Sequence, residues 1–77
     1  MRIERHNGRN IVCGHIYPVS EIKLGSRWAG SSGHEVTVIK IENDWVTYVW
    51  REGEDQHKVR HEKDSFSFQC RYCLIVD

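Results

Sequence analysis

Two runs of β-branched and aromatic residues, separated by a short polar segment, constrain the fold of this chain most strongly. The runs occupy residues 35–41 and 45–50, and a Glu-Asn-Asp triplet at 42–44 lies between them. β-Branched and aromatic side chains favour strands, whereas Asn and Asp favour tight turns. The sequence therefore predicts a β-hairpin over residues 35–50.

The register of this hairpin follows from the length of its loop. A two-residue loop places Ile39 opposite Tyr48, whereas a three-residue loop places Val38 there, and the choice decides whether Trp45 or Trp50 points into the core. The sequence does not separate the two. We favour the three-residue loop, because it gathers one set of large side chains on a single face: Val36, Val38, Val46, Tyr48 and Trp50.

Weaker strand signals lie on both sides of the hairpin. We expect a first strand over residues 22–28, a flexible loop at 29–33, a turn at 52–55 and a polar fourth strand at 56–60. Residues 66–76 alternate in polarity like a closing strand. Its apolar face would carry Phe66, Phe68, Cys70, Tyr72, Leu74 and Val76.

These signals predict an all-β domain, a small SH3-like five-strand barrel over residues 21–77, because closure removes exposed sheet edges. Residues 1–20 have no clean period, so we expect an irregular N-terminal arm or extended segment. Within it, Asn7-Gly8 is a turn signal that could join two short extended pieces. A chain of 77 residues leaves room for one small domain.

Composition restricts the expected cellular location of the protein and the classes of partner that it can bind. The chain carries 11 basic and 11 acidic residues, without the basic excess that drives sequence-independent binding to nucleic acid. No apolar stretch approaches the roughly 20 residues that span a bilayer, and the N-terminus lacks the apolar core of a signal peptide. We therefore expect a cytoplasmic protein that does not bind membranes. In the cytosol its three cysteines are expected to be reduced thiols, and their odd number also argues against a closed disulfide framework.

Cys70 and Cys73 form a C-x-x-C pair that could combine with Cys13 and His15 in a zinc site. Both lie in the predicted strand at 66–76, where a separation of three puts side chains on opposite faces. We therefore expect Cys70 in the core, Cys73 near the surface, and no metal or other cofactor. A zinc-stabilised fold is the less favoured alternative.

Catalytic patterns are not assembled in the sequence. His57 and His61 have the spacing of a helical metal pair, but the glutamate of a metalloprotease motif is missing between them, and a polar edge strand explains both. No Gly-x-Ser-x-Gly elbow or phosphate-binding glycine motif is present. We therefore do not expect an enzyme.

Aromatic residues are the strongest binding signal. Three Trp, three Tyr and two Phe exceed what a small core needs, and small barrels often hold peptides or bases with surface aromatics. An alternative is that all three Trp close the barrel. The predicted binding residues are Trp28, Trp45, Trp50, Arg51, Lys58 and Arg60.

Four short motifs follow one another over residues 22–76. They are Leu24-Gly25-Ser26-Arg27-Trp28, Gly33 to Val38, Val46-Thr47-Tyr48 with Arg51-Glu52-Gly53, and Phe68 before an apolar tail. The series resembles a family of short, functionally uncharacterised proteins from lambda-like phages and prophages of enteric bacteria. The chain departs from that family at Trp45, Trp50 and the Cys70/Cys73 pair. The resemblance implies an accessory protein that acts by binding, and it supplies no site residues.

The leading hypothesis is a non-catalytic protein-interaction module that binds a host factor, a defence component or a phage protein. The alternative is a nucleic-acid-binding barrel, in which the basic residues of the arm and of the fourth strand contact phosphates while Trp45 or Trp50 stacks on bases. Those basic residues are Arg2, Arg5, Arg9, Lys58 and Arg60. An unpaired edge at 56–60 or in the arm would also allow two chains to join as a homodimer.

Overall fold

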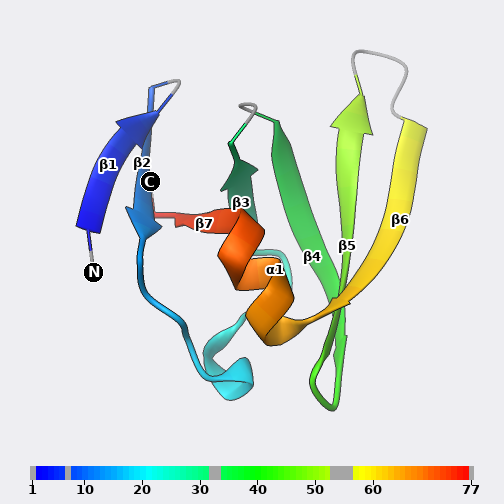
Figure 1. The fold of residues 1–77 in the computed structure, drawn as a ribbon. Helices are drawn as coiled ribbons and strands as arrows, with labels where there is room; N and C mark the ends of the chain where they lie inside the picture. Colours follow the sequence, from blue (N-terminus) through cyan, green and yellow to red (C-terminus); the bar gives the residue numbers. More distant parts are fainter. Residues whose placement is uncertain (1, 7, 32–33, 53–56, 77) are drawn as a thin grey trace.

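The computed structural model describes residues 2–6, 8–31, 34–52 and 57–76. These residues form one antiparallel sheet of seven strands with one short α-helix against it (Figure 1). The elements are β1 (Arg2–His6), β2 (Arg9–Cys13), the 3-10 turn η1 (Val19–Glu21), β3 (Arg27–Gly30), β4 (Glu35–Glu42), β5 (Trp45–Glu52), β6 (His57–Asp64), α1 (Ser65–Arg71) and β7 (Tyr72–Ile75). The all-β prediction is confirmed.

The sheet is open rather than closed. Its strand order is β1-β2-β7-β3-β4-β5-β6, so β1 and β6 are the outer strands of the described part. Five of these strands, β3 to β7, lie beyond residue 21, but the first is β3 at Arg27–Gly30, so the strand predicted over 22–28 and the loop predicted to begin at 29 are wrong in their bounds. They do not close into a barrel by pairing β6 with β7, and two further strands from the first 20 residues extend the sheet on the other side.

The central hairpin of β4 and β5 forms with a two-residue turn at Asn43 and Asp44, because Glu42 pairs with Trp45. The favoured three-residue loop is therefore wrong. Asn43 has a φ of +54°, in the left-handed region that Asn enters more readily than most residues. The side chain of Asn43 thus explains why the turn can be this tight.

A β-bulge at Ile39 shifts the register back within the same hairpin. The pairing changes between Val38 and Lys40, so Val38, and not Ile39, faces Tyr48. A bulge adds one residue to one strand and reverses the alternation beyond it. The partner of Tyr48 is therefore the predicted one. Of the predicted inward set, the structure describes four buried side chains: Val36, Val38, Val46 and Tyr48.

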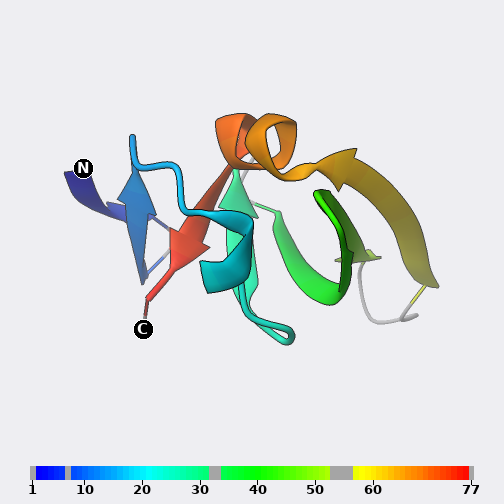
Figure 2. The same cartoon turned by 90° about the horizontal axis from the view of Figure 1, so that it is seen from below.

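The core lies between α1 and one side of the curved sheet, as the view from below shows (Figure 2). Phe68 of α1 is fully buried, and its ring centroid lies 5.1 Å from that of Trp28 and 4.9 Å from that of Tyr48. Full burial of a side chain of this size contributes about 1.5–3 kcal/mol. The buried cluster comprises Ile22, Trp28, Val36, Val38, Val46, Tyr48 and Phe68.

The prediction of a strand over residues 66–76 is wrong for its first half. Residues up to Arg71 form α1, and only β7 is a strand. Alternating residues at 66–71 fit a strand, but the buried positions Ser65, Phe68 and Gln69 are three and four residues apart, the spacing of one helix face. Phe66 is 60% exposed instead of buried. No helix in the described part of the chain is long and apolar enough to cross a membrane.

The first 20 residues are also more regular than predicted. In place of an irregular arm, β1 and β2 form an antiparallel hairpin, with Gly8 at a φ of +77° in the connection between them. The hairpin joins the rest of the sheet where β2 pairs with β7, through Ile11 with Ile75 and Val12 with Leu74. Asn7 lies outside the described residues.

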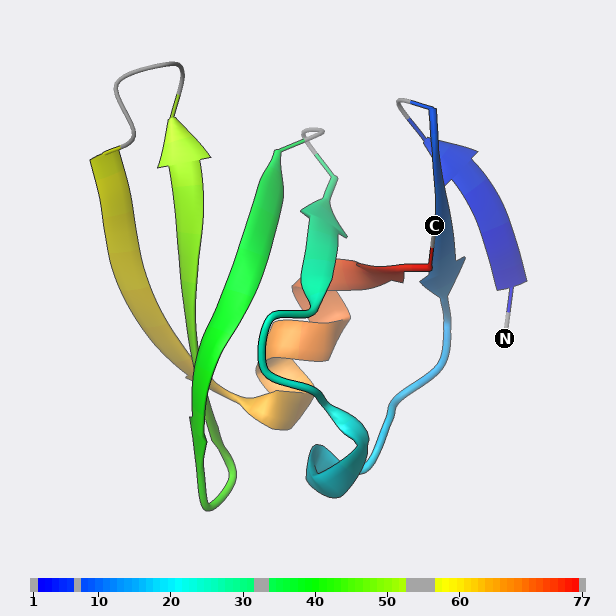
Figure 3. The ribbon, with the colours of Figure 1, turned by 180° about the vertical axis from the view of Figure 1, so that it is seen from behind.

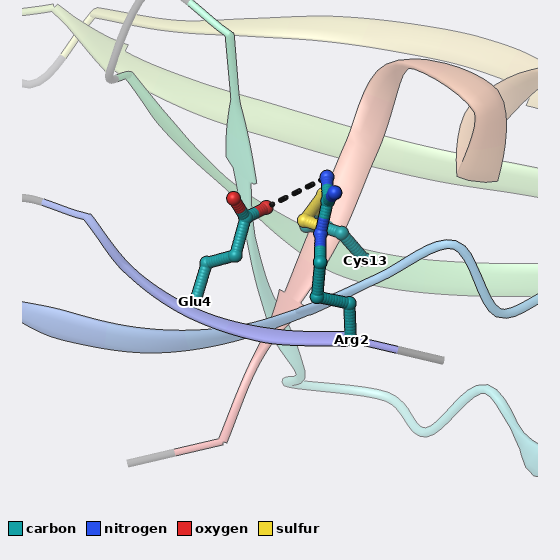
Figure 4. The surroundings of a disulfide bond; sticks show 4 residues. Arg2, Glu4 and Cys13 are labelled. Carbon is teal, nitrogen blue, oxygen red and sulfur yellow. Dashed lines mark hydrogen bonds and ion pairs between the residues drawn. A yellow bond between two sulfur atoms is a disulfide. The ribbon is translucent and has the colours of Figure 1, made fainter.

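The cysteines depart furthest from expectation. Cys13 at the end of β2 and Cys73 in β7 form a disulfide, with Cα atoms 5.2 Å apart, so the prediction of three reduced thiols is wrong (Figure 4). Cys70 carries the free thiol among the described residues, and it is exposed instead of lying in the core. The prediction rested on the expected cytosolic setting, and the odd number of cysteines excludes a fully paired set but not one disulfide.

Candidate functional site

The side of β4 and β5 that faces away from α1 carries no helix in the described structure (Figure 3). Neighbouring residues of a strand point to opposite faces, so Trp45 and Thr47 lie on this outer side while Val46 and Tyr48 enter the core. Trp45 is 54% exposed. An exposed tryptophan on a sheet face is typical of a binding surface.

Trp45 borders a shallow hollow of about 230 Å³ at the turn of the central hairpin, together with Glu42, Asn43, Thr47 and Glu62. Cross-strand pairing positions these side chains, because Glu42 faces Trp45 and Thr47 faces Glu62. The Thr47 hydroxyl donates a hydrogen bond of 3.5 Å to Glu62 Oε1. The indole is thus flanked by two carboxylates.

The charges around this hollow are mostly negative. Glu42 and Glu62 line it directly, and Glu42 Oε2 lies 3.1 Å from Lys40 Nζ in a pair whose side chains are both more than half exposed. An exposed pair of this kind contributes little stability, so a competing cation can displace Lys40. An indole face beside carboxylates attracts an ammonium or guanidinium group. The same carboxylates repel a phosphate.

The predicted binding residues do not form one cluster. Trp28 is 2% exposed and belongs to the core, where its Nε1 donates to Ser26 Oγ at 3.0 Å, and it lines a separate hollow of about 530 Å³ that does not include Trp45. Trp45 is exposed, and so is Arg60, which lies opposite Val49 farther along the outer side of β5. The remaining predicted side chains, of Trp50, Arg51 and Lys58, lie outside the described part.

Glu42, Thr47 and Glu62 were not predicted as binding residues. The pairing of Glu42 with Trp45 could have been found from the sequence, since a two-residue turn at 43–44 places them opposite one another. Thr47 and Glu62 could not, because their pairing depends on where β6 starts relative to β5. The sequence before His57 gives no decisive signal for where β6 starts.

Several basic side chains of the N-terminal half are paired with carboxylates. Arg2 lies 3.4 Å from Glu4, Arg9 lies 3.3 Å from Glu35, and Arg27 lies 3.7 Å from the other oxygen of Glu35. Each pair reduces the positive potential that a phosphate backbone would meet. The predicted basic arm is therefore partly neutralised within its own sheet.

Metal ligands do not converge in the described residues, since no group of three or more His, Cys, Asp or Glu side chains there could hold a metal ion. The disulfide also occupies the sulfur atoms of Cys13 and Cys73, two of the candidate zinc ligands. The side chain of His57, in the other candidate pair, lies outside the described part.

Comparison of the chain with protein-family models, curated proteins and solved structures gives no match. Function is therefore inferred from the residues and their geometry.

Proposed function

We propose that this chain is a small, non-catalytic protein-interaction module, a phage or prophage accessory protein that binds a host or phage protein through the outer side of β4 and β5. The exposure of Trp45 carries the proposal. Tryptophan is enriched among the few residues that dominate binding energy at protein interfaces, and its indole is rigid, so little side-chain entropy is lost on binding.

The partner segment proposed for this site is basic. A lysine or arginine side chain would lie against the indole of Trp45, and its charge would approach Glu42 and Glu62 in the same hollow. A cation–π contact contributes about 0.5–1 kcal/mol at an exposed site, so most of the affinity would come from the apolar contact around it. Ile39, 39% exposed on the same strand pair, offers such a contact.

The fold proposed for β3 to β7 is an SH3-like barrel that is incompletely closed. Two observations support it: the fifth of these strands pairs with the first, and α1 contacts β5, β6 and β7. The helix would then fill the gap between β6 and β7 that a closed barrel bridges with hydrogen bonds. The hairpin of β1 and β2 would be an addition to that barrel.

The nucleic-acid alternative has less support from the same residues. Stacking on Trp45 would bring a phosphate backbone close to Glu42 and Glu62, and Arg2 and Arg9 are paired with carboxylates. Arg60 is exposed near this surface, but a single cation gives little affinity. A gel shift at ~50 mM salt would reveal even weak electrostatic complexes with DNA or RNA, and a clear shift would favour this alternative.

A capture experiment with matched variants tests the proposal. The intact chain, Trp45→Ala and Phe66→Ala serve as baits in a lysate of enteric bacteria, followed by mass spectrometry. Phe66 is the control because it is equally exposed, at 60%, but lies on α1. We expect a protein that the intact chain and Phe66→Ala both retain and Trp45→Ala loses. Equal capture by all three baits, or no enriched protein, would count against the proposal.

A direct binding measurement then tests the charge of the partner. Short peptides containing a single Lys, Arg or Glu in an otherwise identical apolar segment are titrated against the chain while Trp fluorescence is recorded. We expect the cationic peptides to bind more tightly than the acidic one, and Glu62→Gln to reduce that preference. Equal affinity for all three peptides would refute the proposed role of the carboxylates.

A further inference from the structure

All three cysteines of the chain line one hollow of about 370 Å³, on the side of the molecule where β2 meets β7. Cys13 and Cys73 contribute the disulfide, and Cys70 contributes a free, exposed thiol. Ala29, which pairs with Cys73, forms part of the wall of the same hollow. A nucleophile and its electrophile therefore share one solvent-accessible space.

The local fold explains why the thiol and the disulfide meet. Cys70 occupies the last turn of α1, and the chain passes through only Arg71 and Tyr72 before it reaches Cys73 in β7. Pairing of β2 with β7 brings Cys13 to the same place from 60 residues away. The last turn of α1 thus places Cys70 three residues before Cys73, which forms the disulfide with Cys13.

Charged groups around the disulfide come from two elements. Glu4 of β1 and Arg71 of α1 line the hollow with it, and Arg2 pairs with Glu4 in the surroundings of the bond (Figure 4). On the other side of Cys70, a second hollow is lined by Arg71 and His34. Exchange proceeds through the thiolate of the attacking cysteine, and Arg71, next to Cys70 in the chain, lines both hollows.

We propose that Cys70 is the nucleophile of an internal thiol–disulfide exchange. The Cys70 thiolate attacks the sulfur atom of Cys13, the bond between Cys13 and Cys73 breaks, and Cys73 leaves as a thiolate. One disulfide is lost and one is gained, so no external oxidant or reductant is required. The proton released by Cys70 is matched by the proton that Cys73 takes up.

The exchange changes which element holds the N-terminal hairpin. Before it, Cys13 fastens β2 to β7; after it, Cys13 is fastened to the end of α1, and the thiol of Cys73 is free. In a reducing compartment such a bond is transient and responds to redox conditions. This chemistry is independent of binding at Trp45.

Disulfide mapping tests the exchange directly, because trypsin separates the three cysteines. Cleavage after Arg9, Lys23, Lys63 and Arg71 places them in peptides 10–23, 64–71 and 72–77. The intact, oxidised chain is held at mildly alkaline pH, its free thiols are blocked with N-ethylmaleimide, and the digest is analysed without reduction. We expect two cross-linked species, 10–23 with 72–77 and 10–23 with 64–71, the second accompanied by a separate peptide 72–77 that carries the blocking group on Cys73.

Two controls separate internal exchange from other reactions. The share of the second species should not change on dilution, because the step is intramolecular, and it should be absent from Cys70→Ser. A digest that contains only 10–23 with 72–77, with Cys70 fully blocked, would overturn the proposal. So would a second species that occurs only in covalent dimers, or a chain in which Cys13 and Cys73 are both blocked.

Discussion

The two hairpins of this molecule, β1–β2 and β4–β5, are held in the sheet by different means. The central hairpin buries Val36, Val38, Val46 and Tyr48 against α1, each at 2% exposure or less. The N-terminal hairpin leaves Ile3 64% exposed, buries Ile11 and Val12 of β2 at 7% exposure each, and meets the sheet along the short pairing of β2 with β7. The disulfide from Cys13 to Cys73 adds a covalent link at that junction.

The difference shows how a small sheet can be extended beyond its core. Pairing with β7 buries Ile11 and Val12 of β2, whereas the outer strand β1 keeps Ile3 exposed. A covalent bond across β2 and β7 adds to this modest burial, mainly by restricting the unfolded chain. The central hairpin should therefore respond to changes in packing, and the N-terminal hairpin to changes in redox state.

Removing the ring of Phe68 should have the largest effect on stability. Phe68→Ala deletes a fully buried side chain that packs against Trp28, Tyr48 and Tyr72, and such changes cost about 3–5 kcal/mol. Phe66→Ala, on the exposed side of the same helix, should stay within about 0.5 kcal/mol of the parent. Urea unfolding measures both, and equal losses in the two variants would contradict the assignment of the core.

Removing the disulfide should have the next largest effect. Cys13→Ser opens a bond that spans 60 residues, and losing such a bond costs about 2–4 kcal/mol. Because the core is untouched, the near-ultraviolet circular dichroism of the buried aromatics should remain close to that of the oxidised parent. An unchanged midpoint of unfolding would show that the bond does not stabilise the fold.

Ionisation of Tyr48 should have the smallest effect on stability. It reports on the central hairpin and not on the N-terminal one, since residues 2–13 contain no tyrosine. Burial, together with Tyr72 nearby, raises its pKa to about 12 from an ordinary value of 10.0. The neutral phenol is favoured in the folded state, so its contribution to stability is complete below pH 10 and is lost as the pH rises toward 12.

Absorbance of the phenolate measures this titration. In the intact chain the absorbance should include a late step near pH 12, and that step should be missing from Tyr48→Phe. Late ionisation should persist in Cys13→Ser, because that variant leaves the core in place. A single transition near pH 10 in the intact chain would contradict the burial of Tyr48.

The central hairpin could be predicted from the sequence because its information is local. β-Branched density located both strands, and Asn43-Asp44 located the turn. Even there, the bulge at Ile39 could not be foreseen, since a bulge is selected by the packing of Val38 against α1 and not by the residue that bulges. Of the candidate site, the sequence identified Trp45 and missed the carboxylates beside it.

The helix and the disulfide were missed for different reasons. α1 has a local signal that was overlooked: Asp64 caps it by accepting a hydrogen bond of 2.9 Å from the Ser67 N–H, which also lowers the pKa of Asp64. The disulfide has no local signal. It depends on β2 lying beside β7, a pairing between the two ends of the chain that no spacing of cysteines reveals.

Hydrogen exchange with and without a reductant tests most directly whether the two hairpins are held in the sheet by different means. Amide exchange is followed by mass spectrometry on the oxidised chain and on the chain kept in a non-thiol reductant. We predict that reduction accelerates exchange in β1 and β2 while β4 and β5 keep their protection, since burial holds the central hairpin without the bond. Equal loss of protection in both hairpins, or no change in either, would contradict the account.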